Sequence, residues 1–125
     1  MNLKGARILI TGGSSGLGKE MAKVLNEAGA KVLITGRNVS KVQSVAEELG
    51  VAGISADASS EADILRTFEA VKTGLGGLDV LINNAGFGEF ALIEDLTLEA
   101  FQSVFGTNVF GAALMGREAS KIFKE

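Results

Sequence analysis

The sequence predicts an α/β fold in which helices cover both faces of one doubly wound, parallel sheet. Short apolar runs alternate with longer amphipathic stretches, which is the pattern of repeated strand–helix–strand units. Glycine accounts for 17 of the 125 residues, about twice the usual ~7%, which fits several tight corners between strands and helices. No linker, internal repeat or low-complexity segment divides the pattern, so residues 1–125 are expected to belong to one domain.

Four strands are expected in the first two-thirds of the chain. They are the apolar runs at residues 7–11, 31–35, 51–56 and 79–83. The stretches between them have helical periodicity; Asn38 is a good N-cap for the second helix, and Ser59 or Ser60 for the third, which runs to about Thr73. Right-handed crossovers then give the strand order 3-2-1-4. In that order the first strand is central, and ligands bind at its carboxyl end.

The pattern changes after Gly86. Thr97 is expected to cap a helix that contains Phe101 and Phe105, and a second helical stretch runs from about residue 107 to 124. The second stretch is apolar on nearly every side, which is typical of a buried helix. No further strand follows, so we expect a sheet truncated before its later strands, with the fourth strand as an unpaired apolar edge.

Composition excludes several classes of function. The net charge is −3 and no basic block occurs, so a nucleic-acid partner has no electrostatic support. The chain has neither Cys nor His, the commonest metal ligands, and we expect no metal site. The N-terminus lacks a signal-peptide pattern, and the longest uncharged run, residues 100–116, is too short and polar for a membrane span. We therefore expect a soluble, cytoplasmic protein.

The strongest local signal is a glycine-rich corner at residues 8–18, Ile-Leu-Ile-Thr-Gly-Gly-Ser-Ser-Gly-Leu-Gly. An apolar strand ends in this corner, and an amphipathic helix begins directly after it. Glycines leave no Cβ in the way of a ligand, and a helix N-terminus offers free N–H groups and a partial positive charge. We therefore expect a phosphate group to bind at residues 14–18. The alternative is a plain strand-to-helix turn that uses glycine for geometry alone.

Together with three later motifs, this corner resembles the short-chain dehydrogenase/reductase family. The motifs are Thr11-Gly-Gly-Ser-Ser-Gly-Leu-Gly18, Asp57-Ala58, Asn83-Asn84-Ala85-Gly86 and Asn108, in the order and approximate spacing of that family. The resemblance implies a Rossmann-type, NAD(P)-binding domain and hydride transfer between a nicotinamide cofactor and a small carbonyl or alcohol substrate. It covers the whole chain, but it looks like only the first, cofactor-binding half of a family domain about twice this length.

The resemblance also implies which residues bind the dinucleotide. These residues are Gly12, Ser14, Ser15, Gly16, Leu17, Gly18, Arg37, Asp57, Ala58, Asn84, Ala85 and Gly86. By this resemblance Asp57 accepts a hydrogen bond from the adenine amino group, and Asn83 ties neighbouring strands together. Two alternatives stay open: Asp57 caps the following helix, and residues 83–86 form an ordinary turn.

Arg37 favours NADP(H) over NAD(H) as the cofactor. A carboxylate at the end of the second strand would bind a ribose 2′-OH and repel a 2′-phosphate. The sequence there has none, since the nearest acids, Glu27 and Glu47, lie in the flanking helices. Arg37 can form charge-assisted hydrogen bonds to a 2′-phosphate instead. The alternative for Arg37 is a solvated surface side chain.

Asn108 is the one catalytic candidate in the chain. The resemblance implies that it distorts its helix and holds a water of the proton relay behind the active site. Gly106 and Gly111 flank it and weaken the helix, which favours a local distortion. The alternative is a buried Asn whose amide is satisfied by backbone groups.

The acid–base group of the family is missing. The sequence contains no Tyr, so the family's Tyr-x-x-x-Lys motif is absent, and no His or Cys can replace it. We expect the chain to be inactive alone. It is then a fragment of a complete reductase, one of two complementary chains, or a non-catalytic half-domain that binds nucleotide or self-associates. Because a large apolar surface is left over, a homo-oligomer or a complementary second half is expected.

Overall fold

Four parallel strands form one sheet in the order β3-β2-β1-β4 in the computed structural model, which describes residues 2–124. The strands are β1 (Arg7–Ile10), β2 (Lys31–Gly36), β3 (Ala52–Ser55) and β4 (Val80–Ile82). The predicted parallel sheet and its order 3-2-1-4 are therefore confirmed. In the register, Leu9 of β1 lies opposite Leu33 of β2 and Leu81 of β4.

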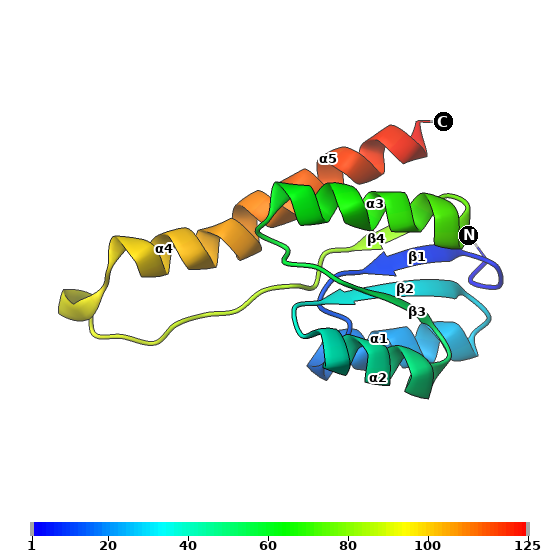
Figure 1. Cartoon of the computed structure of the whole chain (residues 1–125), viewed down its shortest axis with the longest axis horizontal. Helices are drawn as coiled ribbons and strands as arrows, with labels where there is room; N and C mark the ends of the chain where they lie inside the picture. Colours follow the sequence, from blue (N-terminus) through cyan, green and yellow to red (C-terminus); the bar gives the residue numbers. More distant parts are fainter. Residues whose placement is uncertain (1, 125) are drawn as a thin grey trace.

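Helices cover both faces of the sheet. Helices α1 (Gly16–Glu27) and α2 (Val39–Leu49) lie on one face, and α3 (Glu61–Leu75) and α5 (Ala112–Phe123) lie on the other (Figure 1). Side chains alternate across a strand, so Ile8 and Ile10 pack toward α1 and α2, whereas Leu9 packs toward α3 and α5. All three are essentially inaccessible to solvent. The chain thus has the predicted three layers.

The predicted N-caps are confirmed. Oδ1 of Asn38 accepts a hydrogen bond from the backbone N–H of Lys41 at 3.0 Å, and Oγ1 of Thr97 accepts one from Ala100 at 3.1 Å. Ser60, not Ser59, caps α3. Helix α3 runs two residues beyond Thr73, because Gly74 stays helical and the left-handed Gly76 ends it.

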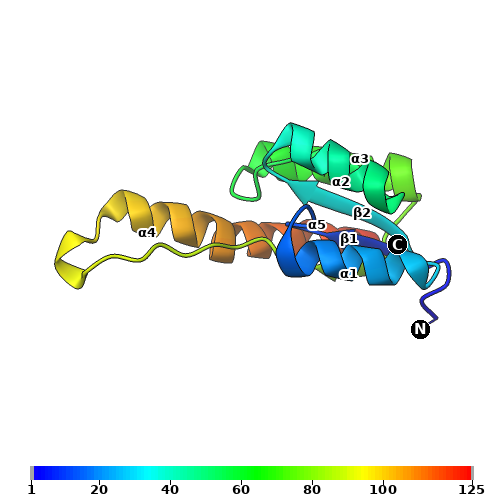
Figure 2. The same cartoon turned by 90° about the horizontal axis from the view of Figure 1, so that it is seen from below.

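The two helical stretches predicted after Gly86 are one continuous helix in the structure. A 3₁₀ turn (Ile93–Asp95) leads into α4 (Leu98–Phe105), a π-helical segment (Gly106–Gly111) and α5. Gly106 keeps right-handed helical angles, φ −56° and ψ −44°, so the chain does not break there. Figures 1 and 2 show α4 extending away from the sheet while α5 packs beside α3.

The expectation that the second stretch is buried is only half right. Met115 and Ala119 of α5 are 1% exposed and belong to the core with Leu9. Phe110 and Phe123 are 62% and 50% exposed. Burial therefore follows the side that contacts α3 and the sheet, and the rest of the apolar surface of this helix faces outward.

Strand β4 forms one edge of the sheet, next to an apolar groove. The groove lies between β4 and α1 and is lined by Leu17, Met21, Val24, Leu25 and Ile82, with Glu20 at its rim. Leu17 and Val24 are 70% and 60% exposed, although their helical spacing groups them with the buried side of α1. Among residues 2–124, no helix has the length and apolar character needed to cross a membrane.

Candidate functional site

The glycine-rich corner lies at the carboxyl end of the central strand. Gly12 has φ +66°, a left-handed value that glycine adopts without strain, and the N–H of Gly13 donates to the carbonyl of Thr35 at 2.8 Å. Ser15 is extended and begins α1, and its hydroxyl makes no capping bond to the helix. The first turn of α1 contains no acidic residue. Free N–H groups and the positive end of the helix dipole are thus available to an anion.

Gly18 is required by close packing within the corner. A Cβ at this position would overlap the carbonyl oxygen of Gly12 and would lie 2.5 Å from Nδ2 of Asn84. The absence of a side chain therefore lets α1 approach both the corner and the end of β4. This is the role that the last glycine of dinucleotide-binding corners plays in helix–strand packing.

A buried hydroxyl joins the corner to the end of β4. Oγ1 of Thr11 accepts hydrogen bonds from the backbone N–H groups of Asn84 at 3.1 Å and Ala85 at 3.0 Å. Nδ2 of Asn84 donates to the carbonyl of Gly12 at 3.0 Å. These contacts bring two of the predicted motifs together, because both follow adjacent parallel strands.

The predicted hydrogen-bond partner of Asn83, a neighbouring strand, is wrong. Nδ2 of Asn83 donates to the carbonyl of Ala112 at 3.1 Å and so joins the end of β4 to α5, not to a neighbouring strand. Asn84 makes the contact between the ends of the strands instead. The two side chains point to opposite sides because successive residues of extended chain alternate.

A pocket of about 300 Å³ opens beside the corner, at the carboxyl ends of the strands. Its lining includes seven of the residues predicted to bind the cofactor: Gly12, Ser14, Ser15, Arg37, Ala58, Ala85 and Gly86. The other lining residues are Thr35, Gly36, Asn38, Lys41, Ala56, Phe87 and Thr107. The predicted residues outside the lining are Gly16, Leu17, Gly18, Asp57, Asn84 and Asn108. They lie in the segments that frame the pocket.

The pocket has two cationic side chains and no acidic one. Arg37 follows β2 and Lys41 lies in the first turn of α2, on either side of the N-cap Asn38. Among the ion pairs of residues 2–124, none uses Arg37 or Lys41. Both cations are therefore available to an anionic ligand at this end of the pocket. Sequence reasoning missed Lys41, although its place three residues after the N-cap is a usable signal.

Asp57 lies at the β3 end of the pocket, where its carboxylate holds a turn. Oδ1 of Asp57 accepts from the hydroxyl of Ser59 at 2.7 Å and from its backbone N–H at 2.9 Å. These two bonds, helped by the positive charge of Arg37, lower the pKa of Asp57 below its usual value. The carboxylate is therefore ionised at neutral pH. Ser59 precedes α3, whose N-cap is Ser60, so Asp57 holds the turn before the helix and the alternative that it caps α3 is wrong. A contact with adenine stays a prediction.

Asn108 lies in the π-helical segment, so the predicted distortion of the helix is confirmed. Its side chain binds the backbone of Phe87 on both sides: Phe87 N–H donates to Oδ1 at 3.0 Å, and Nδ2 donates to the Phe87 carbonyl at 2.7 Å. An Asn side chain has further donor and acceptor capacity after these two bonds. Asn108 thus ties the continuous helix of residues 98–123 (the long helix) to the segment that follows β4. It can still form a further hydrogen bond to a water.

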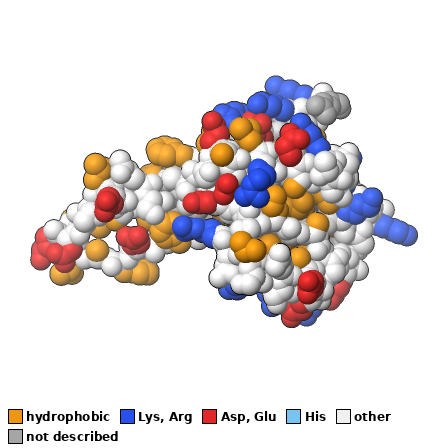
Figure 3. Space-filling model, in the orientation of Figure 1, with side chains coloured by type: hydrophobic (Ala, Val, Ile, Leu, Met, Phe, Trp, Pro, Cys, Tyr) orange, Lys and Arg blue, Asp and Glu red, His pale blue; other side chains and the backbone are white. Residues whose placement is uncertain are grey.

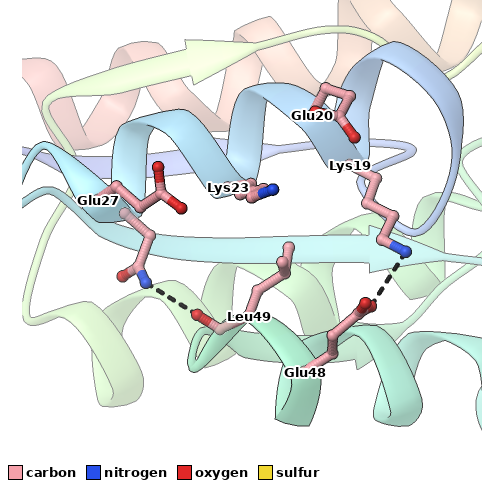
Figure 4. Close-up of a pocket in the computed structure, with 7 residues that line it drawn as sticks. Lys19, Glu20, Lys23, Glu27, Glu48 and Leu49 are labelled. Carbon is pink, nitrogen blue, oxygen red and sulfur yellow. Dashed lines mark hydrogen bonds and ion pairs between the residues drawn. The ribbon is translucent and has the colours of Figure 1, made fainter.

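A second hollow of about 250 Å³ lies between α1 and α2 (Figure 4). There Lys19 pairs with Glu48 at 3.0 Å, and Nδ2 of Asn26 donates to the carbonyl of Leu49 at 2.8 Å. The hollow contains none of the motif residues. Within residues 2–124, no group of three or more acidic, Cys or His side chains could hold a metal ion.

Comparisons with known proteins agree with this geometry. The family model described as short chain dehydrogenase matches residues 6–125. Glucose 1-dehydrogenase of Gluconobacter oxydans is 37% identical over 127 residues, which cover 97% of this chain and 48% of that protein. An uncharacterized oxidoreductase of Methylorubrum extorquens is 36% identical over 125 residues, which cover 95% of this chain and 50% of the relative.

A solved structure shows the same arrangement. The chain superimposes on 3-ketoacyl-(acyl-carrier-protein) reductase from Brucella melitensis, complexed with NADH, with a TM-score of 0.94 and 39% identity. The match covers 98% of this chain and 51% of that one. The chain thus spans about half the length of the relatives it matches. With the family model matching nearly every residue, this chain belongs to the short-chain dehydrogenase/reductase family.

Proposed function

We propose that this chain binds NADP(H) as the cofactor-binding half of a short-chain oxidoreductase. The complete protein would transfer a hydride between the nicotinamide and a small carbonyl or alcohol substrate. The observation that carries the proposal is the single pocket in which the glycine-rich corner, the end of β4 and Arg37 meet. Family membership supports a nicotinamide dinucleotide, and the charges of this pocket support the phosphorylated form.

Each end of the pocket fits a different phosphate of the cofactor. The pyrophosphate would lie on Ser14, Ser15 and the N–H groups that begin α1, since the helix dipole favours a negative charge there. The 2′-phosphate would lie between Arg37 and Lys41. A ribose 2′-OH would find no carboxylate in the lining, which weakens the case for NAD(H). The Brucella reductase has NADH bound, so NAD(H) is the competing cofactor.

Cofactor preference tests this proposal. NADPH and NADH are titrated into the chain, and the dissociation constants are read from nicotinamide fluorescence. We expect NADPH to bind at least about tenfold more tightly, because charge-assisted bonds to Arg37 exist only for the 2′-phosphate. Arg37→Ala should remove most of that preference, with the remainder due to Lys41, and leave NADH affinity nearly unchanged.

The matched control is Lys72→Ala. Lys72 is a cation of α3 that pairs with Glu69 at 3.8 Å and lies outside the pocket. This variant should keep the preference of the unmutated chain. Equal affinities for the two cofactors in the unmutated chain would contradict the assignment of Arg37 to the 2′-phosphate.

In the proposed reaction, this chain binds and positions the cofactor. When bound, the nicotinamide ring supplies or accepts the hydride. The corner and the end of β4 hold the cofactor, and Asn108 is proposed to hold a water of the proton relay. The sequence has no Tyr to give or take the proton, so we propose that the 125 residues alone do not turn over.

A second function is favoured by the surface of the chain: association without catalysis. The large exposed apolar side chains lie mainly on α4, on the segment before it and on the groove beside β4. Such a surface is typical of a protein that binds a second copy or a complementary chain. Under both functions we propose the cytoplasm as the location, which cell fractionation tests.

A further inference from the structure

Three glycines lie along the long helix, and each has a different environment. A Cβ on Gly111 would overlap the carbonyl oxygen of Ala58, in the loop that joins β3 to α3. A Cβ on Gly106 would reach only the Cβ of Ser59, at 3.4 Å, and one on Gly116 would meet nothing within 4 Å. The helix therefore touches the β3–α3 loop most closely at Gly111, where a side chain does not fit.

The loop under Gly111 is held firmly from the other side. The N–H of Asp57 donates to Oδ2 of Asp63 at 2.8 Å, and the N–H of Ser60 donates to the carbonyl of Asp57 at 3.0 Å. Ser59 also bonds twice to the Asp57 carboxylate. A side chain added at Gly111 would therefore be accommodated by movement of the helix rather than of the loop.

Such a movement would change two sides of the pocket at once. Ala58 and Thr107 both line the pocket, and both are buried, at 8% and 7% exposed. Asn108 holds the backbone of Phe87, another lining residue, with two hydrogen bonds. Thr107 and Asn108 lie in the same π-helical segment as Gly111, so their positions depend on how closely this segment approaches Ala58.

We infer that Gly111 is a positioning residue for the cofactor pocket. By having no side chain, it sets the distance between the long helix and the β3–α3 loop, and thereby places Thr107 and Asn108. Gly111 acts through these neighbours and lies outside the lining of the pocket. The inference rests on the proposed function only in so far as the ligand of the pocket is NADP(H).

Glycine-to-alanine substitution at the three positions tests this role. Alanine favours a helix more than glycine does, so helix propensity alone would stabilise all three variants. Gly111→Ala should instead weaken NADPH binding by about tenfold or more, because the overlap displaces the helix. Gly116→Ala, the matched control, should stay within about twofold of the unmutated chain, and Gly106→Ala should lie between the two.

A second readout separates positioning from general instability. The amide N–H of Phe87 donates to Asn108, so its hydrogen exchange reports whether the helix still holds the end of β4. Gly111→Ala should speed exchange at Phe87 and leave the core amide of Leu9 unchanged. General destabilisation would speed both. If Gly111→Ala matches Gly116→Ala in affinity and in Phe87 exchange, the inference is wrong.

Two further outcomes are distinguishable. If the unmutated chain binds neither NADPH nor NADH, the proposed function fails, while Phe87 exchange in the variants still tests the role of Gly111. If Gly111→Ala does not fold, hydrogen exchange of the unmutated chain with and without NADPH tests the inference. NADPH should then slow exchange at residues 107–111 and Phe87 together with residues 57–60. Slowing confined to the glycine-rich corner would overturn the inference.

Discussion

At the scale of single residues, Thr11 shows how one buried hydroxyl can join two motifs. It is 1% exposed, and its oxygen accepts from two successive N–H groups after β4. The N–H of Asn84 has a second acceptor in the carbonyl of Ile82 at 3.1 Å. The N–H of Ala85 depends on the hydroxyl of Thr11. Removal of this hydroxyl should therefore leave one N–H group without its acceptor.

Thr11→Val keeps the shape of the side chain and removes its oxygen. We expect the free energy of unfolding to fall by about 1–3 kcal/mol, the usual cost of a polar group left unpaired. Chemical denaturation followed by circular dichroism measures this change. The control is Thr73→Val, whose exposed hydroxyl bonds only within α3 and whose loss should cost less than about 0.5 kcal/mol. Equal costs for the two variants would contradict the role of Thr11.

Thr11 and Gly111 also show what the sequence could not predict at this scale. The glycine corner, Arg37 and Asn84 could be found because their chemistry is local and their spacing is specific. The partner of Thr11 is more than 70 residues away, and the partner of Gly111 is the backbone of Ala58. Such contacts depend on how segments are brought together in space, which a single sequence does not encode in any short pattern.

At the scale of elements, the short strand β4 is held at both ends by side chains. At its start, Nε of Arg7 donates to Oδ2 of Asp79 at 3.0 Å, and Nη2 donates to Oδ1 at 3.0 Å. Nη1 of Arg7 also donates to the carbonyl of Gly76 at 3.0 Å. At its end, Thr11 and Asn83 hold the strand to the corner and to α5. A three-residue edge strand has few ladder bonds, so these side chains fix its position.

The Arg7–Asp79 pair predicts a pH dependence of stability. Hydrogen bonds from Arg7 lower the pKa of Asp79 from 3.8 to about 2. The pair therefore stabilises the fold fully above pH 4, and this stabilisation is lost as the pH falls from about 4 to 2. Asp79→Asn should flatten the stability profile over that range. Thermal unfolding from pH 7 to 2 measures it.

The control for this experiment is Asp95→Asn, in the exposed 3₁₀ turn before α4. Among residues 2–124, the carboxylate of Asp95 forms no ion pair. Its variant should therefore follow the profile of the unmutated chain. If Asp79→Asn and Asp95→Asn give the same profile, the pair does not stabilise β4.

Most elements could be predicted because their signals are local. Periodicity and caps located the four strands and the first three helices to within about two residues, which is the usual uncertainty of element ends. The continuous helix after Thr97 could not be predicted in this way. Gly106 and Gly111 flank Asn108 and indicate a local distortion, but they do not indicate that the helix continues through it as a π-helical segment. That continuity depends on contacts of Asn108 and Gly111 with distant segments.

At the scale of the whole molecule, the main feature is a large solvent-exposed apolar surface. Figure 3 shows hydrophobic side chains along the projecting part of the chain as well as over the body. Phe90, Ile93 and Leu98 are 104%, 83% and 72% exposed. On α4, the rings of Phe101 and Phe105 stack with centroids 6.4 Å apart, and both are nearly half exposed. Removal of such a surface from water is favourable, so it favours association with another chain.

We predict that the isolated chain self-associates. Sedimentation velocity at increasing concentration should show species larger than the 12.9 kDa chain. The double variant Phe101→Ser/Phe105→Ser should weaken this association, whereas Glu99→Ser, on the same helix, should not. A monomer at all concentrations would contradict the prediction, and an unchanged double variant would place the contact elsewhere, at the groove beside β4.

The unbroken run from α4 to α5 has a mechanical consequence. Because α5 is fixed in the core and the π-helical segment lies against the β3–α3 loop, a rigid tilt of α4 would pivot at this contact, beside the pocket. The eight residues of α4 extend about 12 Å beyond the π-helical segment, so a tilt of ~5° would move the far end of α4 by about 1 Å. A partner bound to α4 would therefore shift the residues of the pocket that lie on this helix, and a ligand in the pocket would in turn change the orientation of α4.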